Sequence, residues 1–96
     1  MLNFIANYKD ASGNDYHNVM QAFTHQGMLI PAANGINTEL KSKGYTLHAL
    51  AYVPGDFTMP ELERMSDVGP MSKGAVLLYM TDAFARECLE EQKASR

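Results

Sequence analysis

Two histidines in residues 14–27, NDYHNVMQAFTHQG, have the side chains best suited to metal chemistry. The apolar residues of this segment recur at helical spacing, and its final glycine can end a helix. We therefore predict one helix over residues 14–27. On that helix His17 and His25 are eight positions apart and point about 80° away from each other. Zinc-binding helices use histidines three or four positions apart, so we expect solvated histidines and no metal site.

The other reactive side chains also lack the neighbours that catalysis needs. Cys88 is the only cysteine and lies in a predicted helix beside Glu87. Negative charge disfavours the thiolate, so we expect Cys88 to be a small buried core residue. Glu90 and Glu91 are adjacent and point about 100° apart on a helix, which is unsuitable for a catalytic pair. We expect no catalytic residue and no cofactor.

His48 lies in the clearest predicted strand, YTLHALAYV, residues 45–53. Strict alternation places His48 on one sheet face together with Thr46, Leu50 and Tyr52. Two interpretations follow. His48 can be hydrogen-bonded beneath a helix, or His48 and Tyr52 can belong to a ligand-binding pocket that forms on oligomerisation.

Methionine is the one residue type in excess, with seven among 96 residues. Met59, Met65 and Met71 lie close together in the sequence, with Lys73 after them. Methionine is common on surfaces that adapt to protein partners, and it also fills gaps in small cores. The first alternative makes Met59, Met65, Met71 and Lys73 a partner-binding surface.

The segment GPMSKG, residues 69–74, resembles part of a phosphate-binding loop. It lacks the spacing of a P-loop, which needs a glycine, four residues and then Gly-Lys-Ser/Thr. It also precedes a predicted strand, whereas a P-loop follows one. We expect a flexible loop, with an anion site at Ser72 and Lys73 as the less favoured alternative.

The remaining elements follow from periodicity and capping signals. Thr58 and Glu61 have the spacing of a capping box, so a helix is expected from Met59 to Ser66. Residues 75–80 form either a strand or the start of one long helix from Ser72, and we favour the strand because Gly74 is poor in a first helical turn. The other expectations are a strand at 2–9, a short strand at 28–30, a helix at 38–43 and a helix at 82–93.

The order of elements predicts a small single-domain α/β sandwich over residues 1–96, with α+β as the alternative. We expect a mixed sheet of three to four strands packed with three to four helices. The net charge of −3 and the scattered lysines and arginines argue against nucleic-acid binding. No apolar run is long enough to span a membrane, and the first ten residues do not resemble a signal peptide. One cysteine fits a reducing cytoplasm.

The sequence is compatible with two functions. The favoured one is a non-enzymatic protein that binds a protein partner, such as a regulator or inhibitor of a larger protein of the kind that a phage or mobile element encodes, and that can form a homodimer. The alternative is a small enzyme or ligand-binding subunit with a pocket near His48 and Tyr52. A flat apolar patch would favour the first, and a concave site with convergent polar groups would favour the second.

Overall fold

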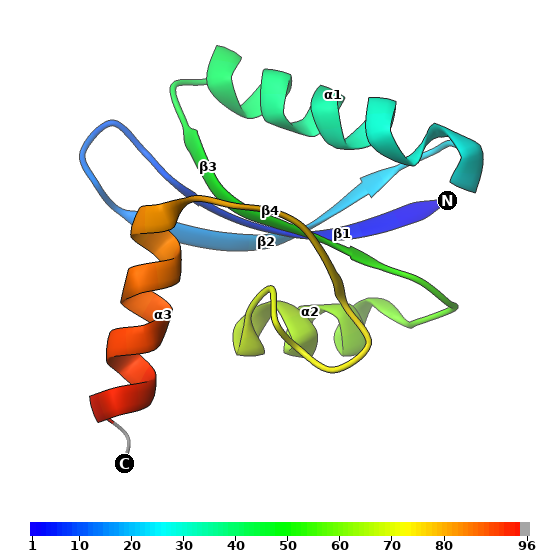
Figure 1. Ribbon diagram of the computed structural model, residues 1–96. Helices are drawn as coiled ribbons and strands as arrows, with labels where there is room; N and C mark the ends of the chain where they lie inside the picture. The colour runs from blue at the N-terminus through cyan, green and yellow to red at the C-terminus, as the bar shows by residue number, and fades with distance from the viewer. Residues whose placement is uncertain (95–96) are drawn as a thin grey trace.

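Residues 1–94 form an α+β structure of four strands and three helices (Figure 1). The computed structural model describes the backbone of residues 1–94 and the side chains of residues 1–25 and 27–90. In chain order the elements are β1 (Leu2–Lys9), β2 (Asp15–Ala22), a 3-10 turn η1 (Gln26–Met28), α1 (Leu29–Ser42), β3 (Thr46–Val53), α2 (Met59–Val68), β4 (Val76–Met80) and α3 (Asp82–Ala94).

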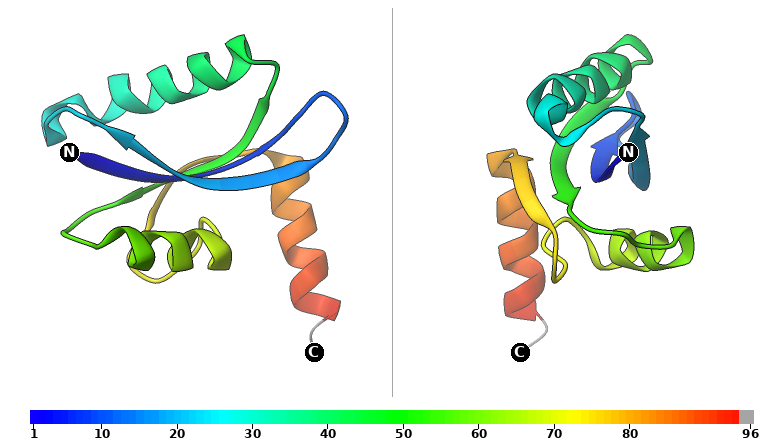
Figure 2. Two further views of the ribbon diagram at one scale, coloured as in Figure 1. Left: turned by 180° about the vertical axis from the view of Figure 1, so that it is seen from behind. Right: turned by 90° about the vertical axis from the view of Figure 1, so that its right-hand side faces the viewer.

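The four strands form one sheet in the order β2-β1-β3-β4. Every neighbouring pair is antiparallel, so the expected strand count is confirmed but the sheet is not mixed. Helix α1 covers one face, while α2 and α3 lie on the opposite face (Figures 1 and 2). The sheet therefore separates two cores of different size.

The larger core lies between the sheet and α1. Its centre is Phe4, which is completely buried, and α1 adds the buried side chains of Ile36 and Leu40. The smaller core lies between the sheet and α2 and consists of Ile5, Val53 and Leu62. Because so few side chains fill the α2 side, that face keeps the two hollows described below.

The helix predicted for residues 14–27 is wrong, because Asp15–Ala22 is strand β2. All eight residues of β2 pair with β1, from Asp15 opposite Lys9 to Ala22 opposite Leu2. A tight turn joins the two strands, in which Oδ1 of Asp10 accepts hydrogen bonds from the backbone N–H groups of Ser12 and Asn14, both at 2.9 Å. Asp10 thereby fixes a hairpin, and backbone pairing with β1 overrides the helical spacing of the apolar residues.

The strand predicted at 28–30 is also wrong, since Leu29 begins α1. The helix predicted at 38–43 is only the last part of this fourteen-residue helix. Pro31 lies in the first turn, where a backbone N–H has no partner within the helix and its loss costs little. The residues that pack on the sheet follow the helical period from Leu29 through Ala32 and Ile36 to Leu40.

The remaining elements follow the sequence closely. The capping box of α2 is present: Glu61 N–H donates to Oγ1 of Thr58 at 3.4 Å, and Thr58 N–H donates to Oε1 of Glu61 at 3.0 Å. Residues 76–80 form strand β4, which confirms the strand interpretation. Thr81 then caps the N-terminus of α3: its Oγ1 accepts a hydrogen bond from Phe84 N–H at 3.2 Å.

Candidate functional site

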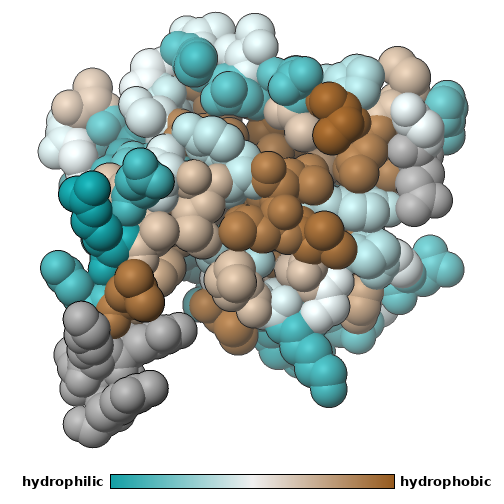
Figure 3. Space-filling view, viewed as in Figure 1, coloured by the Kyte–Doolittle hydropathy of each residue, from teal (hydrophilic) through white to brown (hydrophobic). Residues whose placement is uncertain are grey.

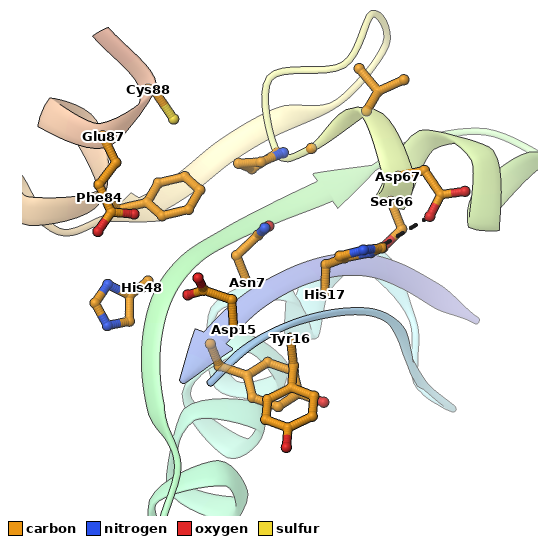
Figure 4. A pocket seen from close by; sticks show the side chains of 14 residues that line it. Asn7, Asp15, Tyr16, His17, His48, Ser66, Asp67, Phe84, Glu87 and Cys88 are labelled. Carbon is orange, nitrogen blue, oxygen red and sulfur yellow. Dashed lines mark hydrogen bonds and ion pairs between the residues drawn. The ribbon is translucent and has the colours of Figure 1, made fainter. Parts of the chain in front are cut away.

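A cleft of about 220 Å³ opens between the sheet, the end of α2 and α3 (Figure 4). Asn7 of β1 lies at its centre, His17 stands on the α2 side, and Phe84 points in from α3 (Figure 4). The full lining is Asn7, Tyr8, Asp15, Tyr16, His17, His48, Ser66, Asp67, Val68, Gly69, Pro70, Phe84, Glu87 and Cys88.

One wall of the cleft brings together a serine, a histidine and an aspartate. Nδ1 of His17 lies 3.2 Å from Oγ of Ser66 and 3.8 Å from Oδ1 of Asp67. A catalytic triad needs the serine and the carboxylate on different nitrogens of the imidazole, so that the ring can pass a proton between them. Here both partners lie at the same nitrogen. The arrangement therefore links β2 to α2 and does not activate Ser66 as a nucleophile.

The carboxylates of Asp15 and Glu87 line the opposite side, and the ammonium group of Lys9 pairs with both of them. Nζ of Lys9 lies 3.3 Å from Oε1 of Glu87 and 3.7 Å from Oδ1 of Asp15. The hydrogen bond to Glu87, with the nearby charge of Asp15, raises the pKa of Lys9 above its usual range. Lys9 thus joins β1 to α3 through Glu87 and adds to the pairing of β1 with β2 through Asp15.

The floor of the cleft contains a buried acceptor with no partner. Oδ1 of Asn7 is buried and makes no hydrogen bond within the described part of the chain. Such a group costs about 1–3 kcal/mol because it has lost its hydration without compensation. The cleft therefore has polar groups that converge on one volume.

His48 lines this cleft, but Tyr52 does not. Asn7 pairs with Ala49 while Tyr8 pairs with Leu47, so His48 is an extra residue in β3 and forms a bulge. The bulge moves His48 off the sheet face that strict alternation predicts. That prediction is therefore wrong for His48.

The surroundings of His48 and Tyr52 differ accordingly. Nδ1 of His48 lies 3.3 Å from Oγ1 of Thr81, and the rings of His48 and Phe84 are 6.4 Å apart. Tyr52 packs on the α1 side, with its ring 5.9 Å from that of Phe4. Among the described residues of one copy, His48 and Tyr52 therefore lie on opposite faces of the sheet and do not line the same cleft.

A second, more open hollow of about 450 Å³ lies beside α2; we call it the α2 hollow. One helical stripe of α2, continued back to Phe57, forms one wall, and the loop before β4 forms the other. Its lining residues are Phe57, Glu61, Arg64, Met65, Val68, Ser72 and Lys73. The α2 hollow is apolar at its wall and has two cationic side chains.

The structure brings together two of the four predicted partner-binding residues. Met65 and Lys73 both line the α2 hollow, and Met65 also packs on the smaller core. Met59 and Met71 do not line it, but they are 42% and 68% exposed, so they do not fill gaps in the core. Sequence reasoning missed Arg64, although its helical spacing from Glu61 and Val68 could have indicated it.

Strand β4 forms an open, apolar edge of the sheet. It pairs with β3 on one side only, and its residues Val76, Leu77 and Tyr79 are 50%, 38% and 46% exposed. The space-filling view shows apolar side chains gathered across this front of the molecule (Figure 3). By contrast the other edge, β2, carries polar side chains such as His17 and Gln21.

Among the described residues, no three His, Cys, Asp or Glu side chains lie close enough together to hold a metal ion. Cys88 is half-buried in the wall of the cleft, which corrects the expectation of a buried core residue. No helix within residues 1–94 is both long and apolar enough to cross a membrane.

The comparisons with known proteins give no relative from which a function could be transferred. No protein-family model, no curated protein and no solved structure matches this chain. The cleft, the α2 hollow and the β4 edge are therefore the features that bear on function.

Proposed function

We propose that this chain is a non-enzymatic binding protein that docks on a larger protein as a regulator or inhibitor. The observation that carries the proposal is the set of exposed apolar side chains on and around α2, of which Phe57 and Val68 line the α2 hollow. Phe57, Met59, Val68 and Met71 are 37%, 42%, 77% and 68% exposed within fifteen residues of sequence. Isolated exposed apolar residues are ordinary, but a group of them beside an apolar hollow is typical of a protein-binding surface.

The arrangement of polar groups supports a binding role over catalysis. The Ser66, His17 and Asp67 side chains meet at one imidazole nitrogen, which does not suit nucleophilic catalysis. We place the protein in the cytoplasm of its host cell, because a single cysteine requires no oxidising compartment. Its gene can be that of a phage or mobile element in that host.

The docking surface can be tested by replacing both Val68 and Met71 with glutamate. Two carboxylates placed on an apolar surface must lose hydration when a partner covers them, so we expect partner capture by chemical crosslinking in host extract to fall at least ~10-fold. The matched control is Ile30→Glu, because Ile30 is 61% exposed on α1 at the opposite face. Equal capture by the folded double variant and the wild type would refute the proposed surface.

We further propose that the protein forms a homodimer by pairing β4 with β4 of a second copy. An exposed edge strand without charges or proline offers unpaired backbone groups to another strand, and β4 has the sequence VLLYM. Leu77→Lys should abolish a dimer seen by sedimentation at ~100 µM, because the charge would be desolvated in the joined sheet. A wild-type protein that stays monomeric at that concentration would exclude the pairing.

The cleft supports a second candidate function, the binding of a small cationic ligand. Asp15, Asp67 and Glu87 line it, and Oδ1 of Asn7 is an acceptor in need of a donor. Removing the competing ammonium by Lys9→Met should increase binding of n-butylamine about 5-fold, followed by backbone chemical shifts. Absence of localised shifts in wild type and variant would reject this function.

A further inference from the structure

The α2 hollow contains a second kind of feature besides its apolar wall, namely two cations that form no ion pair with a described residue. Arg64 and Lys73 both line it and are exposed. Neither takes part in an ion pair with any described residue, whereas Lys9 and Lys43 both do. In a chain of net charge −3, the α2 hollow is therefore a place where positive charge is available to a ligand.

The one carboxylate in the lining is already engaged elsewhere. Oε1 of Glu61 accepts from the backbone N–H of Thr58 at 3.0 Å and from its hydroxyl at 2.8 Å. These two hydrogen bonds, with a smaller contribution from the charge of Arg64, lower the pKa of Glu61. Glu61 is held at the helix N-terminus by its capping role, so it does not form a salt bridge that would occupy Arg64 or Lys73.

Ser72 adds a buried hydroxyl with no partner. It is only 7% exposed, lines the α2 hollow, and its Oγ makes no hydrogen bond within the described residues. Its backbone is fixed, because Ser72 N–H donates to Gly69 O at 3.2 Å and Ala75 N–H donates to Ser72 O at 3.1 Å. The loop therefore holds an unsatisfied hydroxyl donor at the wall of the α2 hollow.

We infer that the α2 hollow binds a carboxylate next to an apolar side chain, as presented by an acidic peptide segment of the protein partner. The inference rests on the proposed docking function and names the chemistry of the partner. Arg64 and Lys73 supply charge-assisted hydrogen bonds, and Ser72 donates a third to the same carboxylate. Phe57, Met65 and Val68 contact the adjacent apolar side chain.

Charge complementarity favours an acidic peptide over an uncharged apolar one. An uncharged segment would cover Arg64 and Lys73 without pairing them, and would leave the Ser72 hydroxyl unsatisfied. A carboxylate compensates all three groups at once. The apolar wall in turn favours a peptide over a free inorganic anion, because an inorganic anion would leave that wall exposed to water.

The test uses the whole protein, labelled with ¹⁵N, and two synthetic peptides, Ac-Leu-Glu-Leu-NH₂ and Ac-Leu-Gln-Leu-NH₂. We expect the glutamate peptide to shift the amides of Arg64, Met65, Ser72 and Lys73 saturably, and to bind about 5-fold more tightly than the glutamine peptide. Lys73→Gln should remove most of that preference. Lys41→Gln is the control, because Lys41 is an exposed lysine on α1 at the opposite face.

The outcomes separate the inference from the proposed function. Equal binding of both peptides at the α2 hollow would overturn carboxylate recognition and leave docking intact. No saturable shift at the α2 hollow with either peptide up to ~10 mM would overturn both. Retention of the full preference for glutamate in Lys73→Gln and in Ser72→Ala would also overturn the inference.

Discussion

Ser72 and Ser66 are the two buried polar residues of the described chain, and they should respond in opposite directions to replacement by alanine. They are 7% and 4% exposed, so their burial is nearly equal. Oγ of Ser66 lies 3.2 Å from Nδ1 of His17, whereas Oγ of Ser72 has no hydrogen-bond partner among the described residues. The pair isolates the effect of one hydrogen bond.

The magnitudes follow from the two environments. A buried hydroxyl without a partner costs about 1–3 kcal/mol, and its removal leaves a void of roughly 15 Å³, which costs about 0.4 kcal/mol. Ser72→Ala should therefore raise the free energy of unfolding by about 1 kcal/mol. Ser66→Ala removes a satisfied hydroxyl and leaves His17 without that partner, so it should lower the free energy of unfolding by about 1 kcal/mol.

Urea denaturation followed by circular dichroism measures both changes, with the wild type and both variants at one pH. For a domain of this size, 1 kcal/mol corresponds to about 4–8 °C in Tm, so thermal melts provide an independent check. If Ser72→Ala destabilises the protein as much as Ser66→Ala does, the Ser72 hydroxyl has a compensating partner. Its availability to a carboxylate ligand would then be refuted as well.

Three further predictions concern the parts of the fold that hold the site. Hydrogen bonds from Asn14, first from its side chain and then from its backbone, lower the pKa of Asp10. A depressed folded pKa stabilises the protein above the unfolded value, near 3.8, and this contribution is lost as pH falls through the folded value. Asp10→Asn should therefore flatten the decline of stability measured from pH 5 to pH 2. Lys9→Met removes the link to Glu87, so amide hydrogen exchange in α3 should become faster while that in β1 stays slow. Leu62→Ala empties a side chain that is 1% exposed and should cost about 2–5 kcal/mol in urea denaturation.

Elements that are specified by neighbouring residues could be predicted from the sequence. The start of α2 depends on Thr58 and Glu61, which lie within one helical turn of each other. Strand β4 was also predictable, because Gly74 before it and the Thr81 cap after it bound a short apolar run. In each case the decisive contacts join residues close in sequence.

Elements that depend on distant pairing could not be predicted in this way. The apolar residues within 15–22 are compatible with the spacing of a helix and with that of a strand. Pairing with β1 decides that this segment is a strand. The bulge at His48 likewise depends on the register between β3 and β1, which no local pattern encodes. The sequence did indicate that Met65 and Lys73 belong to one surface, and both line the α2 hollow. The missing hydrogen-bond partner of the Ser72 hydroxyl depends on the folded loop and could not be predicted.

The strand order has a consequence for how the sheet is assembled as the chain is synthesised. Because the order is β2-β1-β3-β4, each strand after the first hairpin joins the outer side of a strand that is already present. No strand has to enter between two strands that have already paired, so the sheet can grow in one direction as successive segments leave the ribosome. The last strand to be added is β4. Its apolar outer edge thus forms only when the rest of the sheet is complete, and until then β3 is the strand with an open edge.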